Sequence, residues 1–225
     1  MTRVHDMGGR FGDGPVRPEP EDGPVFPEDW HARALALTLA AGSLGQWNID
    51  ISRHARERLS PKDYTRFSYY EKWISALADL LVERGILTPD DLQGNPSESP
   101  HPLAGKAMKA EAVARVLSSG GPADRPSDIP ARFVAGQDVV TSHLAANRLV
   151  DGGHTRLPIY AAGAKGRILR LHGTHVFPDS NAHGLGEAPE PLYAVVFPAS
   201  ELWANPEHPR DEVVLDVWQS HLEPA

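Results

Sequence analysis

The chain has 225 residues, enough for one large or two small domains, and 40% of them are hydrophobic. A hydrophobic fraction of this size supports a buried core and excludes wholesale disorder. The net charge is −8 and no basic patch stands out, so nucleic acid is excluded as an expected partner. The 21 prolines and 20 glycines favour long connections over a simple helical bundle.

The sequence contains no cysteine, so disulfides, thiolate metal sites and cysteine nucleophiles are all excluded. No apolar stretch follows the first residues, and we therefore expect no signal peptide. The longest apolar run covers residues 34–41. It is far shorter than the roughly 20 residues that a membrane-spanning helix needs. We expect a cytoplasmic protein with no membrane partner.

Residues 1–28 are rich in Gly, Pro, Asp and Glu and show neither a helical nor a strand period. Scattered apolar residues, among them Phe11 and Phe26, are available to dock on another surface. Composition leaves two interpretations of this segment open. It is either an extended arm that lies on a partner or a tail without a fixed position.

Residues 29–120 are predicted to form a helical domain that includes a linker. Apolar spacing, capping residues and prolines predict helices over about 29–42, 49–59, after Ser60-Pro61, 68–84, after Thr88-Pro89, and over 106–117. Asp29 is the expected cap of the first helix, and Gly85 is the expected left-handed cap that ends the fourth. The segment 94–102 is assigned to the linker by its Pro and Ser content.

Beyond Gly120 the pattern changes to short β-branched segments that Gly, Pro, Asn and Asp separate. Strands are predicted at Val139-Val140, 167–171, Val176-Phe177, 193–197 and 213–217. Several short strands with irregular loops indicate a small antiparallel barrel. The chain as a whole therefore belongs to the α+β class.

No autonomous catalytic constellation emerges from the residues. His172 and His175 are three positions apart, but without cysteine support a structural or surface role is favoured over metal binding. The segment Gly184-Leu185-Gly186 is too short to cradle a phosphate.

The aromatic cluster near residue 70 is of greater interest. Tyr70 and Trp73 fit a core role, whereas Tyr69 lies off the apolar stripe, where its phenol is available to a ligand. Composition alone gives Arg53 and Arg156 no role other than that of surface residues.

The chain contains several unusual motifs in a particular order. They are His5-Asp6-Met7-Gly8-Gly9, Arg53-His54-Ala55, Tyr69-Tyr70-Glu71-Lys72-Trp73, Gly153-His154-Thr155-Arg156-Leu157-Pro158, and Phe177-Pro178-Asp179 with Gly184-Leu185-Gly186-Glu187. This order resembles that of the nitrile hydratase β subunit, almost from end to end. Family members of this kind act on nitriles, which they hydrate to amides. The resemblance implies an enzyme of the hydro-lyase type that is active only as a complex with an α subunit.

In that family the α subunit holds a cobalt(III) or iron(III) ion in a Cys-x-x-Cys-Ser-Cys loop with two oxidised cysteines. A β chain without cysteine agrees with this division, and the resemblance implies no metal ligand in this chain. At the position of Trp73 some iron members of the family have tyrosine, so the resemblance favours cobalt over iron as the metal of the complex. The implied assembly is an αβ heterodimer, doubled to an α2β2 heterotetramer.

The resemblance also implies the site residues. Arg53 and Arg156 match arginines that suit the oxidised, negatively charged sulfur ligands, because a guanidinium stays protonated and offers a rigid fork of donors. Tyr69 matches a tyrosine whose hydroxyl lies near the metal. Ile49 and Trp73 match apolar wall positions of the substrate pocket. The preferred nitrile is not specified.

The resemblance implies an extended arm over 1–28, a helical domain over 29–120, and an SH3-like barrel over 121–225. Two alternatives stay open: a maturation or assembly partner of the α subunit, and a subunit of the thiocyanate hydrolase type. One departure from the family pattern follows Tyr160, where Ala161-Ala162-Gly163-Ala164 replaces a turn that usually carries a basic residue.

Overall fold

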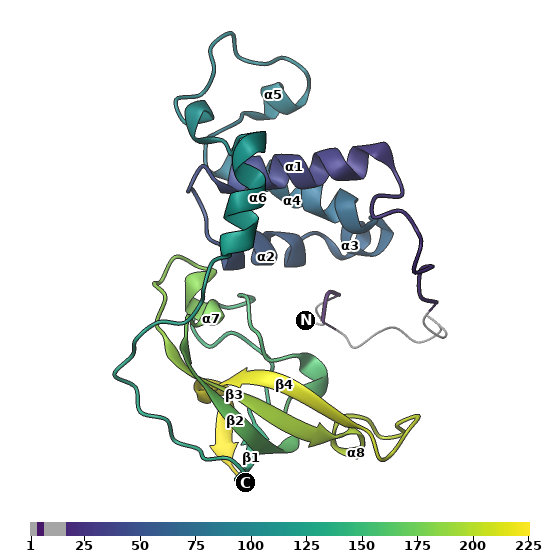
Figure 1. The fold of residues 1–225 in the computed structure, drawn as a ribbon, viewed down its shortest axis with the longest axis vertical. Coiled ribbons are helices and arrows are strands. Elements are labelled where there is room, and N and C mark those ends of the chain that lie inside the picture. The colour runs from purple at the N-terminus through teal and green to yellow at the C-terminus, as the bar shows by residue number, and fades with distance from the viewer. Residues whose placement is uncertain (1–3, 7–16) are drawn as a thin grey trace. The chain divides into compact units, whose positions relative to one another are not determined.

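The computed structural model in Figure 1 describes residues 4–6 and 17–225. These residues form two compact units: a helical unit up to Gly121 and a β unit from Pro122 to Ala225. Asp6 belongs to the β unit, since its carboxylate accepts a hydrogen bond from the Ile159 N–H at 3.0 Å. No helix among the described residues has both the length and the apolar character needed to span a membrane.

The arm predicted over residues 1–28 is described only in part, and its remaining residues lie outside the described ones. Between residues 17 and 28 the chain forms neither helix nor strand. Phe26 contacts Tyr70, with ring centroids 5.9 Å apart, whereas the neighbouring Val25 is 83% exposed. Phe26 therefore packs this segment against helix α4, to which Tyr70 belongs.

The helical unit is built from short helices joined by tight connections. They are α1 (Asp29–Gly42), α2 (Ile49–Glu57), α3 (Pro61–Arg66), α4 (Tyr69–Glu83), α5 (Pro89–Leu92), the 3-10 helix η1 (Ala104–Lys106) and α6 (Ala110–Ser119). Helix α4 packs against both α1 and α2, as Figure 1 shows. The tightest part of this packing involves Ala55, Ala76 and Leu80, with Trp47 and Ile51 beside them.

Capping explains where the helices begin and end. Ser60 starts α3, because its hydroxyl accepts the Asp63 N–H at 3.1 Å. A reciprocal capping box starts α4, in which the Ser68 N–H donates to the Glu71 carboxylate at 2.6 Å. Gly85 follows α4 with φ 65°, which confirms the predicted left-handed cap.

The starts of two helices differ from the prediction, and α2 and α6 also end two residues away from their predicted ends. Glu28, not Asp29, is the N-cap of α1, and its side chain forms a capping box with His31. The helix predicted from Lys106 begins only at Ala110, because residues 104–106 form the separate turn η1.

The β unit contains one antiparallel sheet with the strand order β4-β3-β2-β1-β5. Its strands are β1 (Asp138–Thr141), β2 (Lys165–His175), β3 (Glu190–Pro198), β4 (Glu212–Trp218) and β5 (Leu222–Pro224). Short helices connect them: η2 (Ile159–Ala161), α7 (Pro178–Asn181), α8 (Ala199–Leu202) and η3 (Gln219–His221). Figure 1 shows α7 and α8 at opposite ends of β3.

The sheet is open, so the closed barrel expected from the sequence is not confirmed. Strands β4 and β5 form its two edges, and they do not pair with each other within the described part of the chain. The prediction of a strand at Val176-Phe177 is wrong, because neither residue belongs to a strand. Phe177 instead caps α7, with its N–H donating to the Glu187 carbonyl at 2.8 Å, and Pro178 opens the helix.

Strand β3 lies at the centre of the main core. Tyr193, Val195 and Phe197 are fully buried and alternate along it, as side chains on one face of a strand do. Gly166 on β2 lies against this face, where an added Cβ would be 2.7 Å from the Phe197 ring. Only glycine allows β2 to approach the aromatic core at this point.

A buried phenol links the core to the segment before β1. The Tyr193 hydroxyl accepts the N–H groups of Arg132 and Phe133 at 3.1 and 3.3 Å. It donates to the Gln219 carboxamide oxygen at 2.9 Å. The backbone near residue 132 and the first residue of η3 are therefore held by one hydroxyl group.

We predict that Tyr193→Phe lowers the free energy of unfolding by about 1–3 kcal/mol, because buried partners lose their hydrogen bonds. Thermal unfolding followed by circular dichroism measures this loss. Tyr160→Phe is the matched control, since Tyr160 is half-buried and stacks on Trp203. Equal stability of the two variants would contradict the role assigned to the Tyr193 hydroxyl.

Candidate functional site

Helices α2 and α4 line a pocket of about 490 Å³ within the helical unit. Its lining residues are His5, Ile49, Arg53, Arg56, Glu57, Tyr64, Tyr69, Lys72 and Trp73. The structure thus brings together four residues that the sequence resemblance implied for the site: Ile49, Arg53, Tyr69 and Trp73. Their individual roles stay a prediction.

Helical spacing explains how the pocket is formed. Ile49, Arg53 and Arg56 are four and three residues apart on α2, which places them on one face of that helix. Tyr69 and Trp73 share a face of α4 by the same spacing. The Ser68 capping box begins α4 one residue before Tyr69, and it therefore fixes where this face starts.

Arg53 is held by a carboxylate at the start of its own helix. Its Nη1 donates to Asp50 Oδ1 at 2.9 Å, and Asp50 is 3% exposed. A guanidinium has five N–H donors, so this contact leaves most of them for another acceptor. The Arg53 side chain itself is 43% exposed, which makes those donors accessible from outside the chain.

Two further cations of the pocket lie over aromatic rings. The Arg56 guanidinium is 4.5 Å from the centroid of the Trp73 ring, and the Lys72 ammonium is 4.4 Å from that of Tyr64. Burial lowers the pKa of Arg56, and the positive Arg53 acts in the same direction against the opposing effect of Tyr69. An arginine stays protonated at neutral pH all the same, so the pocket keeps this positive charge.

Glu57 is the acidic residue of the pocket lining. Its Oε2 lies 3.9 Å from His5 Nε2 and 3.6 Å from His54 Nδ1. Burial raises the pKa of the nearby Tyr64 phenol, and the Glu57 charge raises it further. Tyr64 is therefore neutral at physiological pH and keeps its hydroxyl proton.

Apolar side chains form the rim of the same pocket. Ile49 is 62% exposed and Tyr69 is 63% exposed, whereas Trp73 is half-buried below them. The Tyr69 and Trp73 rings are in contact, with centroids 5.5 Å apart. A pocket of this kind can hold a small apolar group beside an anionic one.

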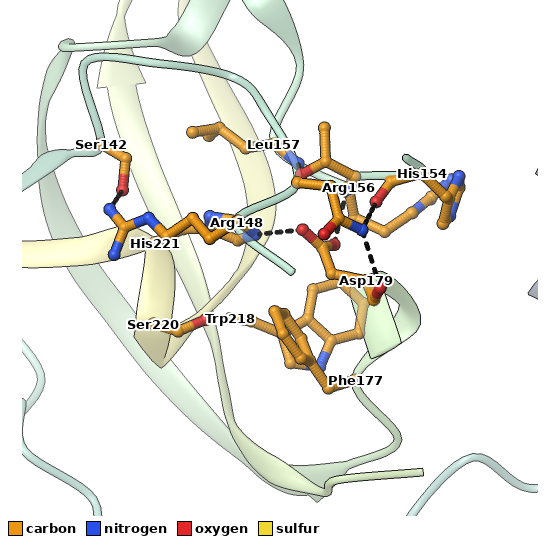
Figure 2. Close-up of polar contacts among 12 residues, drawn as sticks. Ser142, Arg148, His154, Arg156, Leu157, Phe177, Asp179, Trp218, Ser220 and His221 are labelled. Atoms are coloured by element: carbon orange, nitrogen blue, oxygen red, sulfur yellow. Dashed lines mark hydrogen bonds and ion pairs between the residues drawn. The ribbon is translucent and has the colours of Figure 1, made fainter. Parts of the chain in front are cut away.

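Arg156, the remaining predicted site residue, lies in the β unit and not in this pocket. It belongs to the loop before η2, and its side chain is exposed. Its backbone N–H donates to Asp179 Oδ1 at 3.3 Å, as the close-up in Figure 2 shows. Within the described part of the chain, its guanidinium has no hydrogen-bond or ion-pair partner.

Sequence reasoning overlooked Arg56, Lys72 and Asp50. A signal for them existed, because Arg56 follows Arg53 by three residues and Lys72 follows Tyr69 by three. The spacing from Asp50 to Arg53 likewise permits an ion pair along the helix. These spacings identify pocket residues only when α2 and α4 are known to line the same pocket.

The charges of the pocket indicate whether it can bind a metal ion or the anionic groups around one. Guanidinium and ammonium groups are poor ligands for a cation, whereas they suit anionic groups that surround one. The chain also has no cysteine to offer as a soft ligand. The lining has three cations, Arg53, Arg56 and Lys72, against two side chains that could ligate a metal, His5 and Glu57. Its charge therefore suits the anionic surroundings of a metal centre better than the metal itself.

The chain thus combines a helical unit that carries a cationic pocket with apolar walls and a unit built on an antiparallel sheet. Comparison with known families gives the class of protein. The family model described as nitrile hydratase beta subunit, N-terminal, matches residues 1–118, and the C-terminal model of the same subunit matches residues 122–224. The chain belongs to the nitrile hydratase beta subunit family.

Several curated relatives resemble the chain over its full length. The beta subunit of the low-molecular weight cobalt-containing nitrile hydratase of Rhodococcus rhodochrous is 36% identical, with 100% of both chains covered. The beta subunit of Pseudomonas putida nitrile hydratase is 35% identical, again with 100% of both covered. The cobalt-containing relative of Pseudonocardia thermophila is 34% identical over 99% of this chain and 96% of its own length.

A solved structure of apo thiocyanate hydrolase from Thiobacillus thioparus is also similar, with a TM-score of 0.38 and 21% identity. The alignment covers 62% of this chain and 98% of the other. A similarity of this size carries no argument about function.

Proposed function

We propose that this chain supplies the substrate pocket and two hydrogen-bonding arginines to a cobalt nitrile hydratase whose metal its α subunit holds. The observation that carries the proposal is the α2–α4 pocket, which gathers Ile49, Arg53, Tyr69 and Trp73. Two of the curated relatives are named as cobalt-containing, which supports cobalt over iron. The reaction is R–C≡N plus water giving R–C(O)NH2, and it belongs to the lyase class.

Four side chains of the pocket, together with Arg156 of the β unit, have a part in the proposed reaction. Arg53 and Arg156 donate N–H groups to the oxidised, negatively charged sulfurs of the α subunit and keep them in place. The Tyr69 hydroxyl hydrogen-bonds in the space where the nitrile is bound. Ile49 and Trp73 contact the R group and exclude bulk water.

Cobalt(III) bound in the α subunit supplies a Lewis acid to the site. The contribution of this chain is electrostatic and steric. Its fixed guanidinium groups stabilise negative charge in a site that partner contact closes to water, where such charges interact more strongly.

The proposed working complex is a cytoplasmic α2β2 heterotetramer in which residues 1–28 form an arm on the α subunit. We also propose that residues 121–225 form an SH3-like barrel that is open between β4 and β5. The order of its strands supports this, because β1 to β4 form a meander and β5 returns to β1.

We predict that the isolated chain binds no stoichiometric cobalt or iron and hydrates no nitrile. Three cations of its pocket, Arg53, Arg56 and Lys72, disfavour a bound metal ion, so both metal content and activity should require the α subunit. Metal analysis and amide formation are measured on the chain alone and on the co-expressed complex. Amide production by the purified single chain would refute the proposal.

We predict that Arg53→Lys and Arg156→Lys each slow nitrile hydration by about a hundredfold. Lysine keeps the charge but loses the planar fork of donors. A loss of ~2.7 kcal/mol in the transition state is enough for a hundredfold effect. The rates are measured on complexes with full metal loading.

Arg33→Lys is the control, because Arg33 is an exposed residue of α1 outside the pocket. We expect it to hydrate nitriles at the unmodified rate. Normal rates in both the Arg53 and the Arg156 variants would mean that these arginines are ordinary surface residues.

A further inference from the structure

A buried polar network ties the loop that carries Arg156 to helix α7. The Asn147 carboxamide nitrogen donates to the carbonyl of His154 at 2.6 Å and to that of Asp179 at 2.7 Å. Its oxygen accepts the N–H groups of Leu149 and Val150 at 2.7 and 2.9 Å. One side chain thus satisfies backbone groups at both ends of the loop and on α7, which fixes their relative positions.

Asp179 forms the second tie, directly at Arg156. Its carboxylate is 1% exposed, and Oδ1 accepts the Arg156 N–H at 3.3 Å. Its Oδ2 lies 3.5 Å from Nε2 of His221, which is 2% exposed and belongs to η3. Figure 2 shows the carboxylate of Asp179 between Arg156 and His221. The pair therefore joins three segments that are distant in the sequence.

A buried pair of this kind adds little to the stability of a core. A carboxylate and an imidazole both lose hydration on burial, and a well-packed apolar pair of similar size is often as stable or more so. The polar pair instead restricts the conformation of the loop. The hydrogen bond from the Arg156 N–H to Asp179 Oδ1 needs a suitable distance and angle, and few conformations of the loop provide them. That backbone N–H belongs to the residue whose guanidinium is exposed and has no partner in the described part of the chain.

We propose that Asp179 and His221 are positioning residues for Arg156, holding its backbone so that its guanidinium meets the anionic ligands of the α subunit. The inference rests on the function proposed for Arg156 above. Neither Asp179 nor His221 touches the substrate in this scheme. Asp179 acts through the Arg156 backbone, and His221 acts by fixing the orientation of the Asp179 carboxylate.

The test uses Asp179→Ala, Asp179→Asn and His221→Phe in the complete complex with the α subunit. Asp179→Ala should lower kcat about tenfold at normal metal content, because small displacements of a catalytic donor are costly. Asp179→Asn keeps an oxygen acceptor for the Arg156 N–H, and it should recover most of the rate. KM should change less than about twofold in all three variants, since the apolar walls of the pocket are untouched.

Asp216→Ala and His172→Phe are the matched controls. They remove an exposed Asp–His pair of the same β unit, in which His172 Nε2 lies 2.8 Å from Asp216 Oδ1. Exposed pairs of this kind contribute little to stability. We expect the kcat of both controls to stay within about twofold of the unmodified complex.

A double-mutant cycle separates positioning from a merely structural role. If Asp179 acts through Arg156, adding Asp179→Ala to Arg156→Lys should lower kcat by less than about twofold, whereas adding it to Arg53→Lys should still cost about tenfold. Equal losses in both backgrounds would overturn the inference. So would failure of both Asp179→Asn and His221→Phe to assemble, because the pair would then be needed for folding itself.

The cycle also distinguishes this inference from the function on which it rests. A normal rate for Arg156→Lys would refute the function proposed for Arg156. A slow Arg156→Lys complex beside a normal Asp179→Ala complex would refute the positioning role alone.

Discussion

Helices α2 and α4 approach each other through small side chains, Ala55 and Ala76, which are 1% and 2% exposed. Larger residues at these two positions would hold the helices apart, because a packed interior has little room for added volume. The close approach places the Arg53 face of α2 and the Tyr69 face of α4 on the same pocket. The shape of the pocket therefore depends on the small size of Ala55 and Ala76.

The same packing determines the electrostatic character of the pocket. Arg56 and Lys72 are placed over aromatic rings, and Arg53 is held by the buried Asp50. Positive charge fixed in this way attracts anions without reorganising when they bind. In the proposed complex these charges face the anionic ligands of a metal that the α subunit holds.

The sequence predicted most of the helical unit, because its signals are local. The Ser60-Pro61 start, the Ser68 start and the Gly85 end each depend on a few neighbouring residues. The β unit was less predictable. Strand β5 has three residues and ends in Pro224, so only its pairing with β1 identifies it as a strand.

The site was predictable in part for a similar reason. Resemblance to a family indicated Arg53 and Tyr69 one residue at a time, and the structure places them in one pocket. Residues that act through others leave no local signal. Asp179 reads as a turn residue in the sequence, and its contacts with Arg156 and His221 depend on three segments meeting in the fold.

The proposed function requires that Arg53 and Arg156 each donate hydrogen bonds to anionic ligands of the metal in the α subunit. A crystal structure of the cobalt-loaded complex, with the metal located by anomalous scattering, would show these contacts. We expect each guanidinium group within about 2.7–3.2 Å of an oxygen on an oxidised cysteine sulfur. A metal centre with neither arginine in hydrogen-bond contact with its ligands would contradict it.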